Sequence, residues 1–94
     1  MKSQHHFEIQ SETALREATK IRTLIADLDR IVRILNCDIA TEEERTRVFD
    51  RSDAKYSILA RTLATRRDNL AHTVAALEQR FATIKAPLFE PVVA

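Results

Sequence analysis

A single apolar stripe runs through the second half of the chain, from Thr41 to Lys85, where the sequence contains neither glycine nor proline. Its members recur at alternating intervals of three and four residues, which is the spacing of one face of an α-helix in a coiled coil. The stripe comprises Phe49, Tyr56, Ala60, Leu63, Leu70, Val74, Leu77, Phe81 and Ile84, and only Asp53 and Arg67 interrupt it. We therefore predict a helix over about residues 42–85. It would be roughly 65 Å long, and a helix of that length needs a packing partner.

The first half of the chain has the same rhythm and predicts a helix over about residues 5–36. Its apolar positions are Phe7, Ala14, Ala18, Ile21, Ile25, Leu28, Val32 and Leu35. Asn36 suits the left-handed conformation that ends many helices, and Thr41 and Glu44 have the spacing of a capping box. The turn over residues 37–41 is short, so the two helices are expected to be antiparallel neighbours. The sequence thus predicts an all-α helical hairpin.

A tight turn near residue 39 also predicts which residues face each other. Positions whose numbers sum to about 78 would then lie level across the hairpin. Arg67 would fall beside Glu12, and Asp53 would fall near Arg22. Each polar interruption of the stripe would therefore meet an opposite charge, an arrangement that sets the register of helices at some loss of stability.

Several apolar residues have no partner in this predicted hairpin. The last three members of the stripe would lie level with the N-terminus or beyond it, and other apolar residues stand beside the seam. Together they form the predicted dimer interface: Leu24, Ile31, Leu59, Leu77, Phe81 and Ile84. Because two helices alone bury little surface, we expect two hairpins to pack as a homodimeric antiparallel four-helix bundle.

The composition excludes several classes of protein. A chain of 94 residues makes one domain, and the complete lack of glycine argues against Gly-rich phosphate loops and dinucleotide-binding motifs. The net charge of +1 provides no strong field for nucleic acid. No segment is apolar for the length of a membrane span, and residues 1–6 lack the apolar core of a signal peptide. We expect a cytoplasmic protein without a cofactor.

Residues 86–94 differ in character from the hairpin domain over 1–85. They include Pro87 and Pro91, which disfavour a helix and favour an extended chain. This apolar tail either folds over the end of the bundle or docks on another protein.

Two side chains are candidates for a chemical role. His72 is expected on the outer face of the second helix, one turn after Asp68, but two ligands are too few for a metal site. An exposed histidine on a bundle also suits a phosphotransfer module. The only cysteine, Cys37, is expected in the turn, and its neighbours Asn36 and Asp38 offer no positive charge that would activate it.

A short segment and the basic residues give the remaining alternatives. Residues 21–29 are similar to the opening helix of the all-helical chorismate mutases, but the arginine expected further along is absent, so no site residue is carried over. Arg47, Arg51 and Lys55 are spaced four apart, and they are followed by Arg61, Arg66 and Arg67. Such a stripe can contact phosphates, although acidic residues are interspersed and nucleic acid is an unlikely partner.

The predictions therefore point to a non-enzymatic interaction protein. It would act through homodimerisation and through its helical outer face or its tail. The first alternative is a nucleic-acid-associated protein that uses the basic residues of the second helix. The second is a small all-helical enzyme, which would need a pocket between helices, or a phosphotransfer module.

Overall fold

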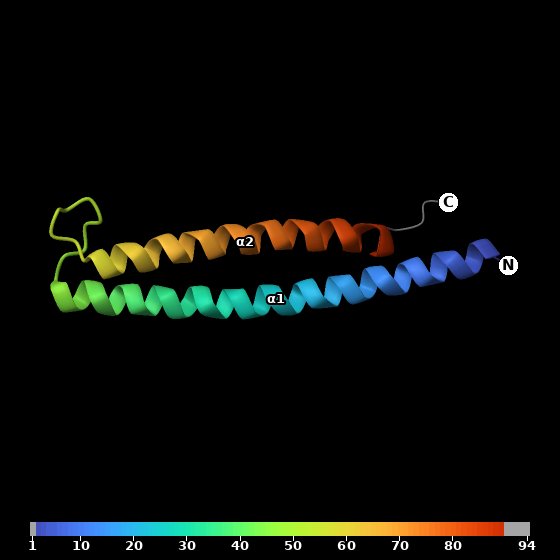
Figure 1. Cartoon of the computed structure of the whole chain (residues 1–94), viewed down its shortest axis with the longest axis horizontal. Coiled ribbons are helices and arrows are strands. Elements are labelled where there is room, and N and C mark those ends of the chain that lie inside the picture. The colour runs from blue at the N-terminus through green and yellow to red at the C-terminus, as the bar shows by residue number, and fades with distance from the viewer. Residues whose placement is uncertain (1, 90–94) are drawn as a thin grey trace.

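The protein is a hairpin of two long helices in a computed structural model that describes residues 2–89, with side chains described for residues 12–84. Helix α1 spans Lys2–Thr46 and helix α2 spans Ile58–Phe89, and these residues contain no strand. Figure 1 shows the helices side by side and antiparallel, joined at one end by a loop. The chain measures 69 × 23 × 15 Å. The predicted all-α hairpin of two packed helices is confirmed.

The core is the seam between α1 and α2, and most of its buried residues occupy the predicted heptad positions; Ile39, expected in the turn, and Ala64, expected beside the seam, are the exceptions. The buried apolar residues are Ala18, Ile21, Leu35 and Ile39 on α1, Ala60, Ala64 and Val74 on α2, and Tyr56 in the loop. Two of the buried side chains nearest the loop, Ala60 and Ala64, are small. Tyr56 is the one large aromatic side chain in this set, and it closes the loop end of the seam.

The predicted turn over residues 37–41 is wrong. Helix α1 continues through Asn36 and through the expected capping box at Thr41 and Glu44, and the loop comprises residues 47–57. The helix ends where Arg47 takes a positive φ of 59°. The Arg47 N–H donates to the Glu43 carbonyl over 2.8 Å, which is the hydrogen bond of a left-handed C-terminal cap.

Short polar side chains fix the loop that follows. The Asp50 carboxylate accepts hydrogen bonds from the Ser52 N–H at 3.0 Å and from its hydroxyl at 2.7 Å. The Asp53 carboxylate accepts from the Lys55 N–H at 2.8 Å. Such contacts mimic backbone turns and compete with a helix. The chain therefore reverses here because its local hydrogen bonds favour turns, even though its apolar spacing continues that of the helices.

The later turn changes the register across the hairpin. The pairs that join the two helices are Glu17 with Arg80, Asn36 with Arg67, and Glu42 with Ser57, so the numbers of level residues sum to about 100 and not 78. Arg67 donates to the Asn36 side chain at 3.1 Å and does not lie beside Glu12. Asp53 lies in the loop and not near Arg22. Both predicted pairings are wrong.

The new register also gives partners to the end of the apolar stripe. Leu77, Phe81 and Ile84 are half-buried at seam positions of α2. Phe81 directly follows Arg80, whose guanidinium pairs with Glu17 on α1. The expectation that these three residues extend beyond the hairpin is therefore wrong, and with it the reason for placing them in a dimer interface.

The C-terminal boundary also differs from the prediction. Helix α2 continues past Pro87 to Phe89, so residues 86–89 are helical and not extended. A proline near the end of a helix removes one backbone hydrogen bond, which a last turn tolerates better than a helix interior. The rest of the predicted tail, residues 90–94, lies outside the described residues.

Candidate interaction surface

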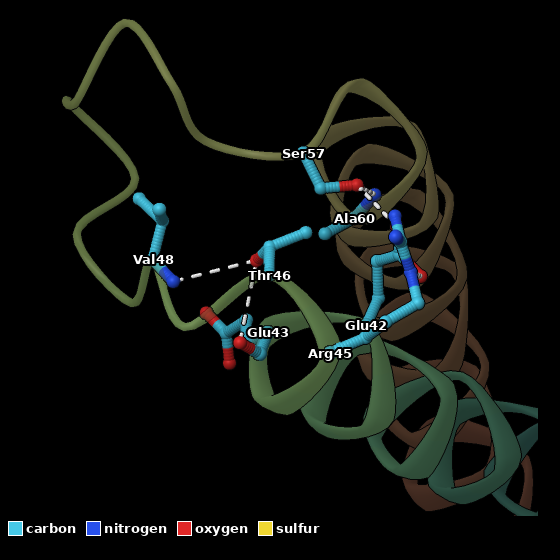
Figure 2. A network of polar contacts seen from close by, with 7 residues as sticks. All are labelled: Glu42, Glu43, Arg45, Thr46, Val48, Ser57 and Ala60. Carbon is cyan, nitrogen blue, oxygen red and sulfur yellow. Dashed lines mark hydrogen bonds and ion pairs between the residues drawn. The ribbon is translucent and has the colours of Figure 1, made fainter.

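A polar cluster joins the two helices at the loop end of the hairpin (Figure 2). The Glu42 side chain points from α1 toward Ser57, whose hydroxyl donates to Glu42 Oε1 over 2.8 Å. The same hydroxyl oxygen accepts from the Ala60 N–H at 3.1 Å, so Ser57 is the N-cap of α2. Arg45 donates to Glu42 through Nε at 3.0 Å and through a second nitrogen. The carboxylate thus holds together the end of one helix and the start of the next.

A second contact lies beside the first. Tyr56 is only 3% exposed, and its hydroxyl donates to Glu43 Oε2 over 2.9 Å. The Arg61 guanidinium carbon lies 5.7 Å from the centre of the Tyr56 ring, within the range of a cation–π contact. The loop is therefore bound to both helices, to α1 through Glu43 and to α2 through Arg61.

These contacts change the acidity of the groups that make them. Hydrogen bonds from Arg45 and Ser57 lower the pKa of Glu42 to about 2, although burial acts in the opposite direction. The bond to Glu42 raises the pKa of Arg45. Burial, together with the bond to Glu43, raises the pKa of Tyr56. Each of these shifts is caused mainly by burial or by a contact within the cluster itself, which links the ends of the two helices.

Periodicity alone could not find this cluster. Glu42 and Glu43 appeared as the start of a helix, and Tyr56 as one more member of an apolar stripe. The available signal was Ser57 followed by a helical pattern, with Asp50 and Asp53 shortly before it, because this composition is typical of turns and caps.

An apolar face runs along one broad side of the hairpin. The Glu17–Arg80 ion pair marks this side, since it joins α1 to α2 across it. Leu24 and Ile31 follow Glu17 by one and two heptads, and Leu59 precedes Arg80 by three, so all three lie on the same side. Ile34, three residues after Ile31, is their neighbour on the helix surface. We refer to Leu24, Ile31, Ile34 and Leu59 as the apolar face.

The four residues of the apolar face are exposed. Their exposed fractions are 45% for Leu24, 36% for Ile31, 53% for Ile34 and 54% for Leu59. No large side chain among those described is fully buried. The sequence predicted Leu24, Ile31 and Leu59 as interface residues and missed Ile34, whose heptad position is one step further from the seam.

The structure divides the predicted basic stripe. Arg47, Arg51 and Lys55 lie in the loop and so do not form one helical row. Arg47 pairs with Glu44 at 2.7 Å. On α2, Arg61 lies over Tyr56, and Arg67 is bound to Asn36 and Asp68. Arg66 is exposed on the same helix. The continuous track that phosphates would need is therefore broken at the loop.

The residues considered for chemistry lie apart. His72 is exposed on α2, as predicted, and an open hollow beside it is lined by Asp68, Ala71, His72 and Ala75. Cys37 is exposed as well, but on α1 and not in the turn. Among the described residues, no three His, Cys, Asp or Glu side chains come close enough to hold a metal ion. All four residues that line this hollow belong to α2.

Comparisons with known proteins add no family. No family model matches the chain, and no curated protein or solved structure is significantly similar to it. Within residues 2–89, neither helix combines the length and the apolar composition that crossing a membrane requires.

Proposed function

We propose that the protein is a non-enzymatic interaction protein that pairs with a second copy of itself through the apolar face. The observation that supports this proposal is a row of exposed aliphatic side chains along one side of a thin hairpin. Two hairpins that cover each other's rows form an antiparallel four-helix bundle with twofold symmetry. The seam of a single hairpin buries few large side chains. In the bundle, the apolar face of the second hairpin packs beside this seam and buries more of them.

The exposed surface of one hairpin is large enough for an interface with a second copy of the chain. A compact protein of 10.8 kDa exposes about 5,500 Å², whereas this chain exposes 7560 Å². The elongated hairpin, 69 × 23 × 15 Å, exposes more area for its mass than a compact protein does, and a standard interface buries about 800 Å² of each partner. One hairpin therefore has ample surface for an interface with another. Because the apolar face can pack against an identical apolar face, the proposed partner is a second copy of the same chain.

Molar mass measured by light scattering tests the proposal. We expect the wild-type protein to approach twice 10.8 kDa as its concentration rises through the micromolar range. Ile31→Asp places a charge in the middle of the apolar face and should shift the protein to monomer. We expect it to weaken association about tenfold or more, because an unpaired buried charge is strongly unfavourable.

Ala26→Asp is the matched control. Ala26 is exposed on α1, two residues after Leu24, and so lies about 200° around the helix from it. This variant adds the same charge but should leave the dimer intact. Circular dichroism checks that both variants remain helical. A wild-type chain that stays monomeric throughout, or a dimer that Ile31→Asp does not weaken, would overturn the proposal.

A further inference from the structure

The two helices share one heptad register that continues through the loop without a break. One seam column comprises Ala18, Ile25, Val32, Ile39 and Thr46 on α1, Asp53 in the loop, and Ala60, Arg67, Val74 and Phe81 on α2. The other seam column passes from Glu42 through Phe49 and Tyr56 to Leu63 with the same period. A loop that reverses the chain lets the second helix begin in any of seven phases. The hairpin alone therefore does not require this match.

The loop itself is suited to becoming a helix. Residues 47–57 contain no glycine and no proline, the two residues that oppose a helix most strongly. The hairpin instead requires a left-handed conformation at Arg47, with φ 59°, which is unfavourable for arginine because its Cβ atom comes too close to the following carbonyl oxygen. It also leaves Phe49 55% exposed, although Phe49 occupies a seam position of the register.

We infer that the hairpin can open at this loop and exchange helices with a second copy of the chain. Residues 47–57 then join α1 and α2 into one continuous helix, and two such helices pair in antiparallel fashion. This inference goes beyond the proposed function and does not rest on it, because the exchange uses the seam between α1 and α2 and leaves the apolar face free.

The exchanged dimer keeps the register that the hairpin already has. In the hairpin, the midpoint of the Glu17–Arg80 pair falls between residues 48 and 49. The midpoint of the Glu42–Ser57 pair falls between residues 49 and 50. The midpoint of the Asn36–Arg67 pair falls between residues 51 and 52. When the same residues pair between two chains, the twofold axis therefore passes within the segment from residue 48 to residue 52, which includes Phe49. The Phe49 rings of both chains then meet at the axis, which buries an aromatic side chain that the hairpin exposes.

Other contacts favour the closed hairpin, so the two forms compete. The turns at Asp50 and Asp53 and the cap at Ser57 exist only while the loop is bent. Helix exchange breaks these local hydrogen bonds. It forms helical backbone hydrogen bonds in residues 47–57 and the contact between the two Phe49 rings instead. Because it joins two chains, mass action makes it depend on protein concentration.

Cross-linking across the seam distinguishes the two forms. We choose Asn36→Cys with Arg67→Cys, since these side chains contact each other across the seam and neither belongs to the apolar face. The exposed Cys37 is replaced by serine. The protein is refolded at micromolar and at near-millimolar concentration and treated with a short bis-maleimide. A closed hairpin gives an internal cross-link, whereas the exchanged form gives a covalent dimer on a denaturing gel.

We expect the covalent dimer fraction to rise about tenfold between the two concentrations. Small-angle scattering of the dimer fraction should show a rod lengthened from the 69 Å of the hairpin to roughly 130 Å, the length of a continuous helix over residues 2–89. Only internal cross-links at both concentrations would overturn the exchange. A dimeric mass accompanied by internal cross-links alone would support pairing through the apolar face and reject the exchange.

Two loop variants sharpen the test. Asp50→Ala with Asp53→Ala removes both turn-forming side chains and should raise the covalent dimer fraction severalfold. Arg47→Gly with Phe49→Gly favours the bent loop and removes the ring at the axis, so it should lower that fraction severalfold. Circular dichroism should show more helix in the dimer than in the monomer. A dimer fraction that neither pair of substitutions changes would contradict the inference.

Discussion

The Ser57 hydroxyl lies 2.8 Å from Glu42 Oε1 and 3.1 Å from the Ala60 nitrogen, so one side chain both caps α2 and binds α1. This relationship connects local structure to tertiary structure. The cap determines where α2 begins, and the bond to Glu42 determines which turn of α1 lies beside that beginning. The pairing of Glu17 with Arg80 at the far end of the hairpin has nearly the same register.

Replacing Ser57 with alanine should destabilise the hairpin by about 1 kcal/mol or somewhat more, because it removes an N-cap together with a bond between helices. Urea unfolding followed by circular dichroism measures this, at one fixed protein concentration, since association would change the apparent stability. Thr62→Ala is the control, because the Thr62 hydroxyl bonds only to the Ile58 carbonyl of its own helix. Equal stabilities of the two variants would show that Ser57 has no special role.

The Ser57→Asp variant distinguishes the capping of α2 by Ser57 from its hydrogen bond to Glu42. Aspartate caps helices as well as serine does, but here it would place a second carboxylate against Glu42. We expect this variant to be less stable than Ser57→Ala near neutral pH and to recover when Glu42 is also replaced by glutamine. If Ser57→Asp were as stable as the wild type, the cap alone would account for the contribution of Ser57.

The stability of the hairpin should fall in acid because of Glu42. Its carboxyl has an ordinary pKa of 4.5 and a folded pKa of about 2. The folded state therefore binds a proton less readily than the unfolded state, so its stabilisation is complete above about pH 5 and disappears as the pH falls to about 2. The lowered pKa of Asp50 acts in the same direction.

Melting temperatures measured between pH 7 and pH 2 test this expectation, with Glu42→Gln as the comparison. The amide cannot ionise, so the variant should melt several degrees lower at neutral pH but lose less stability on acidification. The two curves should approach each other at low pH. Parallel curves would mean that another carboxyl group causes the dependence on acid.

Tyr56 provides a spectroscopic reporter of the loop, because it is the only tyrosine and the chain has no tryptophan. Burial, and then the bond to Glu43, raise its pKa above the ordinary 10.0. The absorbance of tyrosinate should therefore appear at higher pH in the native protein than in denaturant. Glu43→Gln should lower the midpoint without restoring the ordinary value, since burial is the larger cause. Glu44→Gln, on an exposed neighbour, should leave it unchanged.

The sequence was sufficient to predict two antiparallel helices and most of their seam. Ala18, Ile21, Leu35 and Val74 are buried where the heptad period places them, because burial of an amphipathic stripe depends on spacing alone. Leu24, Ile31 and Leu59 are exposed beside the seam for the same reason. The association of two hairpins stays a prediction.

The periodic spacing of apolar residues did not predict the position of the loop. Phe49 and Tyr56 continue the stripe, so their spacing predicted helix where the chain turns. The turn depends instead on hydrogen bonds of Asp50 and Asp53 with residues two positions away, and on bonds between residues 13 and 15 positions apart in the Tyr56–Glu43 and Ser57–Glu42 pairs. Contacts of the second kind exist only once the hairpin has formed, and an amphipathic pattern contains no information about them.

Arg47 offers a last prediction, because it is the only described residue with a positive φ. Glycine takes this conformation without steric penalty, whereas a residue with a Cβ atom loses about 1 kcal/mol there. Arg47→Gly should therefore stabilise the closed hairpin by up to about 1 kcal/mol in urea unfolding. Arg47→Ala is the control: it removes the same exposed ion pair with Glu44 but keeps the Cβ atom, so it should bring no gain. If alanine stabilised the protein as much as glycine did, the gain would come from the lost arginine charge and not from the backbone.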